Sequence, residues 1–92
     1  MIARPGNTVV AIYVTNGFSS SVSVIKTATN TVVKAVPVGS GVPEGIAVTP
    51  DGTKVYVTNS GSNVVLVIAR PGNTVVANFP VGLGPAGVAI GP

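Results

Sequence analysis

The 92-residue sequence predicts an all-β fold in which one four-stranded sheet is built twice. The tetrapeptide Tyr-Val-Thr-Asn occurs at 13–16 and again at 56–59. Short runs of β-branched residues, bounded by Gly, Pro, Asn, Asp or Ser, are typical of strands. Twelve glycines and eight prolines are spread through the chain, and no helical periodicity is present. Repeats of about 40 to 50 residues with strand-like patterning are typical of β-propeller blades.

The strands are predicted in order from the alignment of the two copies. Residues 1–92 form one repeat domain, with repeat one at about 9–50 and repeat two at about 51–92. Neighbouring antiparallel strands joined by connections of about four to seven residues make an up-and-down sheet. The predicted strands are 10–15, 21–26, 31–38, 45–49, 54–58, 63–69, 74–80 and 87–91.

Strands 45–49 and 87–91 are predicted to be the innermost strands of blades. Both alternate glycine or alanine with larger apolar residues, and strands crowded around a propeller axis have little room. Between 45–49 and 54–58, Asp51-Gly52 has turn chemistry, because glycine adopts positive φ without strain.

The order of the strands predicts association between chains. The first blade lacks an innermost strand, while 87–91 has no blade of its own. Because bare strand edges favour pairing, we expect 87–91 of one chain to pair with 10–15 of the next. Propellers have about four to eight blades, so we favour a trimer with six blades, and next a tetramer with eight. The predicted interface residues are Val10, Ile12, Val14, Val88, Ala89 and Ile90.

Three segments resemble the YVTN family of β-propeller repeats. They are the two Tyr-Val-Thr-Asn copies, Val-Ser-Val-Ile-x-Thr-Ala-Thr-Asn-Thr-Val-Val at 22–33, and Gly-Ile-Ala-Val-Thr-Pro-Asp-Gly-Thr-Lys-Val-Tyr at 45–56. The resemblance implies a propeller with a binding or cell-surface role, as in surface-layer and other extracytoplasmic proteins of archaea and bacteria. Family rings often have seven blades, which two per chain cannot build. This departure is expected of a fragment, a natural short relative or an engineered chain.

Composition excludes several classes of function. With five basic and two acidic residues, the cations are too few and scattered for a nucleic-acid surface. The absence of cysteine and histidine removes disulfides and the commonest metal ligands. The longest apolar run, 64–69, is far shorter than the roughly 20 residues of a membrane-spanning helix. The N-terminus lacks the layout of a secretory signal, so localisation rests on the resemblance alone.

No catalytic or cofactor-binding residue is predicted. Glu44 and Asp51 lie at opposite ends of one strand, about 20 Å or more apart, too far for the carboxylate pair of a glycosidase. In a closed ring, copies of Glu44 offer a weak candidate cation site at the channel mouth. Tyr13 and Tyr56 are expected to be packing residues, and Phe18 is the expected exposed aromatic.

These observations favour a non-catalytic module that assembles into a ring and acts as a scaffold or protein-binding disc. The first alternative is a multivalent sugar-binding propeller, whose shallow sites gain affinity through avidity. It is weakened by the absence of tryptophan. A metal-dependent propeller hydrolase of the lactonase type is third, because its acidic and histidine ligands are nearly absent.

Overall fold

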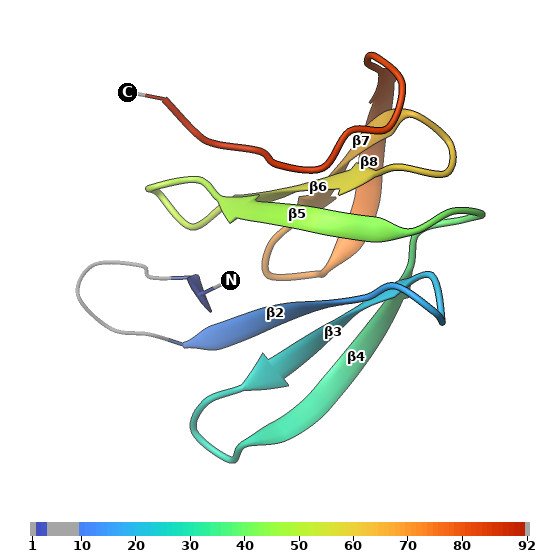
Figure 1. Ribbon diagram of the computed structural model, residues 1–92. Coiled ribbons are helices and arrows are strands. Elements are labelled where there is room, and N and C mark those ends of the chain that lie inside the picture. Colours follow the sequence, from blue (N-terminus) through green and yellow to red (C-terminus); the bar gives the residue numbers. More distant parts are fainter. Residues whose placement is uncertain (1, 4–9, 92) are drawn as a thin grey trace.

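The computed structural model describes residues 2–3 and 10–91, which form two four-stranded antiparallel sheets. The sheets lie face to face (Figure 1). The described residues include no helix, and so none that is long and apolar enough to cross a membrane. The first sheet has the order β1 (Ile2–Ala3), β2 (Ala11–Asn16), β3 (Ser21–Lys26) and β4 (Thr31–Pro37). The second has the order β5 (Pro43–Val48), β6 (Lys54–Asn59), β7 (Val64–Ala69) and β8 (Thr74–Pro80).

Seven of the eight predicted strands are confirmed; two have the predicted bounds, and the ends of the other five differ by at most two residues. In each sheet the chain runs from one edge to the other, because every strand pairs with the next along the sequence. The repeat extends to irregularities: the β3–β4 register shifts between Val24 and Ile25, and the β7–β8 register shifts between Val67 and Ile68. The two sheets are therefore copies of one unit, as the repeated tetrapeptide predicts.

The core lies between the two sheets and follows the two-residue period of the strands. Alternate residues of β2 and β3, such as Tyr13 and Val24, meet alternate residues of β6 and β7, such as Val57 and Ile68. The buried cluster is Ala11, Tyr13, Val22, Val24, Val36, Val38, Val55, Val57, Leu66 and Ile68. Neither sheet buries this face alone, so each repeat needs the other to fold.

The backbone conformation of the turns also repeats between the two sheets. Ser20 and Asn63 both have positive φ, at 51° and 56°, and both end the turn before a third strand. Asn30 and Asn73 have φ of 55° and 57° in the turn before the fourth strand. Asparagine tolerates this left-handed conformation better than most residues. The Asp51-Gly52 turn is also confirmed, with Gly52 at φ 73°.

Two predictions at the chain ends are wrong. Residues 87–91 form no strand; they are an extended and mostly exposed segment, because no strand is beside them to complete a ladder. The edge at 10–15 is not fully open, because Ile2 pairs with Ile12 and Ala3 with Ala11. A two-residue strand is too short to show in a pattern analysis, and it occupies only part of the edge of β2.

Candidate functional site

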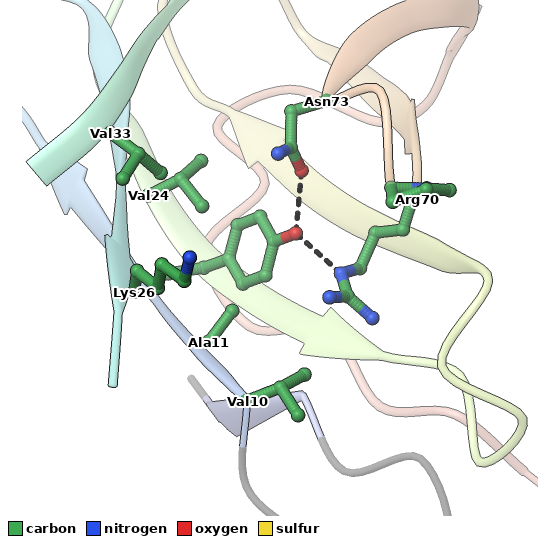
Figure 2. A pocket seen from close by; sticks show the side chains of 9 residues that line it. Val10, Ala11, Val24, Lys26, Val33, Arg70 and Asn73 are labelled. Carbon is green, nitrogen blue, oxygen red and sulfur yellow. Dashed lines mark hydrogen bonds between the residues drawn. The ribbon is translucent and has the colours of Figure 1, made fainter. Parts of the chain in front are cut away.

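A pocket of about 360 Å³ opens between the two sheets, where β2 and β3 meet the turn between β7 and β8 (Figure 2). The first sheet contributes mainly apolar walls, and the turn contributes polar groups. The lining residues are Val10, Ala11, Tyr13, Val24, Lys26, Val33, Arg70, Pro71 and Asn73.

Tyr13 is the centre of the pocket's polar groups. Its side chain is fully buried in the core, as predicted for a packing residue. Its hydroxyl donates to Oδ1 of Asn73 over 2.6 Å and accepts from Nε of Arg70 over 2.6 Å. Burial raises the pKa of Tyr13, while the hydrogen bond and the charge of Arg70 oppose part of that rise. The phenol therefore stays neutral at ordinary pH and cross-links the two sheets.

Arg70 is held in three ways. Its Nη1 donates to the carbonyl of Gly52 over 2.8 Å, and its guanidinium carbon lies 5.8 Å from the centre of the Tyr13 ring. Together with the Nε bond, these contacts fix the planar group against an aromatic face. Lys26 also lines the pocket, whereas neither Glu44 nor Asp51 does. The lining is thus positively charged, and it suits a small anion better than a cation.

This cluster was missed by sequence reasoning, although one departure between the copies marks it. Arg70 occupies the place that Thr27 holds in the first copy. The residues it joins are far apart in sequence, 57 residues in the case of Tyr13. Only the packing of one sheet on the other brings them together.

The two carboxylates have separate and simple roles. Glu44 is exposed on β5, and its backbone carbonyl accepts from Oγ1 of Thr15 over 3.2 Å. Asp51 accepts hydrogen bonds from Thr49 Oγ1, Thr53 Oγ1 and the Thr53 amide. The Thr49 and Thr53 bonds lower the pKa of Asp51 to about 2. Asp51 thus organises its turn, and the described residues include no cluster of three acidic, histidine or cysteine side chains for a metal.

The predicted interface residues separate into three places. Ile12 and Val14 alternate along β2 with the core-facing Ala11 and Tyr13, and Val14 is 39% exposed. Val88, Ala89 and Ile90 lie in the extended C-terminal segment. Val10 lies before β2 and is partly buried against the core between the two sheets. Phe18, predicted to be exposed, is fully so.

The segment after β8 follows the same path as the segment after β4. Oγ1 of Thr58 donates to the carbonyl of Ala86 over 2.7 Å, just as Oγ1 of Thr15 donates to the carbonyl of Glu44 over 3.2 Å. Thr58 and Thr15 are the threonines of the two Tyr-Val-Thr-Asn copies. Ala86 and Glu44 each directly precede the glycine of a predicted innermost strand.

A second pair of contacts repeats in the same way. The amide of Val38 donates to the carbonyl of Ser20 over 3.0 Å, and the amide of Val81 donates to the carbonyl of Asn63 over 2.9 Å. Residues 38–44 lead from the first sheet into β5 of the second sheet. Residues 81–86 therefore leave the second sheet along the route that would begin a third, and they lie on its side away from the first sheet (Figure 1).

Comparison with known proteins supports the blade assignment and leaves the family open. No family model and no curated protein matches the sequence. The fold is similar to that of hydrazine synthase from Kuenenia stuttgartiensis, with a TM-score of 0.82 and 28% identity over 94% of this chain. The chain spans 26% of that chain, and hydrazine synthase contains β-propeller domains. The two sheets of this protein are accordingly blades of the β-propeller type.

Proposed function

We propose that this chain is a non-catalytic repeat module that assembles head to tail into a closed β-propeller and acts as a scaffold or protein-binding disc. The observation that carries the proposal is the course of residues 81–86, which repeats the contacts that residues 38–44 make on the way into the next blade. In this proposal, residues 87–91 become the innermost strand of a following blade. In the proposed assembly, the first sheet of a second chain supplies that blade.

The outer face of the first sheet supports a second copy as the partner. By repeat, Ile12, Val14 and Ile25 correspond to Val55, Val57 and Ile68 of the core. The face that the first sheet presents to the outside is therefore apolar at the three positions that already pack against a blade inside the chain. Blades of one unit stack on the same residues throughout a repeat array.

The register of the proposed pairing follows from the register of β5 on β6. Ile46 pairs with Val57 in that ladder, and the corresponding residues in the proposed pair are Val88 and Val14. Directly opposed residues of antiparallel strands lie about 4.5–5.5 Å apart at Cα, within the span of a disulfide. The chain contains no cysteine of its own, so an introduced pair gives an unambiguous cross-link.

The test is oxidation of a Val14→Cys/Val88→Cys double variant, followed by non-reducing electrophoresis and mass measurement in solution. Because each chain carries both cysteines, we expect a ladder of covalent oligomers that ends at the closed ring, with three chains favoured over four. Val14→Cys/Ala89→Cys is the matched control, because Ala89 points to the opposite face of the strand. Equal cross-linking of both variants, or a parent chain that stays single at all concentrations, would contradict the proposal. Deleting residues 84–92 should abolish association.

The pocket favours a second candidate function, the binding of a small anion such as a carboxylate or phosphate. Two cationic side chains line the pocket and no carboxylate does. The test is an NMR titration with inorganic phosphate, in which the Arg70 and Tyr13 signals should shift and saturate in the parent. These signals should shift less in Lys26→Gln. The control is Lys54→Gln, which removes an exposed charge outside the pocket and should give the same shifts as the parent.

A further inference from the structure

The two most exposed large apolar side chains among the described residues are Phe18 and Leu83. Their relative exposures are 111% and 91%. Phe18 lies in the turn between β2 and β3, and Leu83 lies in the segment after β8. Neither is apolar in the other repeat, where Gly61 stands in place of Phe18 and Ser40 in place of Leu83. Both departures therefore add exposed apolar surface to the chain.

The junction between the two sheets of one chain shows where these positions meet. Gly61 is in contact with Gly41, so closely that a Cβ atom on either would collide with the other's backbone. Ser40 is the neighbour of Gly41, and its carbonyl accepts from Nδ2 of Asn59 over 3.2 Å. The positions of Ser40 and Gly61 are thus adjacent wherever one blade follows another.

We propose that Leu83 of one chain packs against Phe18 of the next and forms an apolar lock at the junction between chains. This inference rests on the proposed head-to-tail assembly. Within one chain, the first sheet is followed by the second, and the junction between them is complete. The second sheet is followed by no sheet of its own chain, so a second copy would complete that junction. Leu83 and Phe18, which are exposed in the single chain, would fill it. Burying both removes apolar surface from solvent at the point of contact.

The lengths of the two connecting segments fit the change from glycine to phenylalanine. Between Gly41 and Pro43 the first segment carries Val42, while Gly84 is followed directly by Pro85. The Val42 side chain approaches Gly17, where a Cβ would stand 3.2 Å from Cγ1 of Val42. The shorter segment brings no such side chain to the junction between chains. At that junction the counterpart of Gly17 is Ser60 of the preceding chain, and Phe18 of the following chain supplies apolar volume from the other side.

A second copy is the proposed occupant because Ser40 and Gly61, the counterparts of Leu83 and Phe18, are neighbours at the chain's own inner junction. Phe18 carries a side chain where Gly61 has none, so the junction between chains must be wider at this point, and the two side chains fill it. The contact would continue the apolar outer face of the first sheet, formed by Ile12, Val14 and Ile25. An unrelated protein partner would not be expected to depend on Leu83 and Phe18 together, since they lie on different repeats. The coupling between the two side chains is therefore the measurement that identifies the occupant.

The test uses the full-length chain with each residue replaced by its counterpart in the other repeat, as Phe18→Gly and Leu83→Ser. The dissociation constant of the oligomer is measured by sedimentation velocity over a concentration series. Each substitution should raise it by about tenfold or more, as expected for apolar anchors at an interface. The double variant should raise the dissociation constant by much less than the product of the two single increases, because either substitution alone breaks the same contact. Since both side chains are exposed in the single chain, far-UV circular dichroism and urea midpoints should not change.

The control is Val75→Ser, which replaces an exposed valine that pairs with Ile68 on the core side of the second sheet. It should leave the dissociation constant unchanged. If the parent associates and Val14→Cys/Val88→Cys cross-links, but Phe18→Gly and Leu83→Ser associate like the parent, the lock is wrong and the assembly stands. If the increase in the dissociation constant of the double variant equals the product of the two single increases, the two side chains act independently and the lock is also wrong. A parent that never associates would overturn both.

Discussion

Asn59 shows how one buried side chain joins successive blades. It is fully buried, and its Nδ2 donates to the carbonyls of Val38 and Ser40 over 3.0 and 3.2 Å. Those carbonyls belong to the segment that connects the sheets. Asn16, its counterpart, is only partly buried and donates instead to side-chain oxygens of its own sheet. The same tetrapeptide thus has different partners, because only the second copy has a blade before it in the chain.

We expect Asn59→Ala to lower the free energy of unfolding by about 1–3 kcal/mol, since buried carbonyls lose their donor. Asn16→Ala is the matched control and should cost less than about 1 kcal/mol, because water can replace its hydrogen bonds. Urea denaturation at a concentration where the chain is single measures both. Equal losses of unfolding free energy in the two variants would show that the Asn59 hydrogen bonds do not stabilise the connecting segment.

Asp51 gives a pH dependence whose sign follows from its lowered pKa of about 2, against 3.8 for an ordinary aspartate. Because the folded chain holds the carboxylate form, this contribution to stability is complete above about pH 4 and is lost as the pH falls toward 2. We expect the Thr53 amide signal in NMR to titrate in this range and to stop doing so in Asp51→Asn. A midpoint near 4 would mean that the Thr49 and Thr53 hydrogen bonds are absent in solution.

At the scale of elements, the crossing of the connecting segment over the β6–β7 turn depends on two glycines. Gly41 has a φ of 120°, and Gly61 lies against its backbone. We expect Gly61→Ala to destabilise the chain by about 1–3 kcal/mol, because the added methyl must push two backbones apart. Thermal and urea unfolding measure the change.

Gly72→Ala is the matched control for Gly61→Ala. Gly72 lies in the β7–β8 turn, and a Cβ there meets nothing within 4 Å. It should be neutral or stabilising by about 0.4–1 kcal/mol, through the loss of chain entropy in the unfolded state. Destabilisation by both substitutions to the same degree would mean that the close approach of Gly41 and Gly61 is not needed.

The strands could be predicted because their signal is local. β-branched residues in β3 and β7, and turn residues between them, are properties of the sequence within a few positions. Three features could not be predicted from the sequence, because each depends on residues that are distant in the chain. Ile2–Ala3 is too short for a pattern, and 87–91 has the composition of an innermost strand but no strand beside it. The Tyr13–Arg70–Asn73 cluster exists only because one sheet packs on the other; the sequence marks it by Arg70 at the place of Thr27 but does not indicate its partners.

At the scale of the whole molecule, the proposed assembly would make the two chain ends compete for one strand edge. Ile2 pairs with Ile12 in the single chain. The pairing of Val48 with Val55 in the second sheet implies, by repeat, that Ile90 of a neighbouring chain needs the same Ile12. Strand β1 and the incoming C-terminal segment cannot both occupy this place. Association in the proposed assembly therefore includes the cost of releasing β1.

Deletion of residues 1–9 should consequently strengthen association, because the edge of β2 is then free. The hydrogen bonds lost with β1 are worth about 0.5–1.5 kcal/mol each, so each bond that no longer has to be broken should raise the association constant by about two- to thirteenfold, measured by sedimentation velocity. The same deletion in a chain that also lacks residues 84–92 is the control, and it should not associate. If the shortened chain associates more weakly than the parent, then β1 belongs to the assembled state, and the innermost strand of the first blade comes from the chain itself and not from its neighbour.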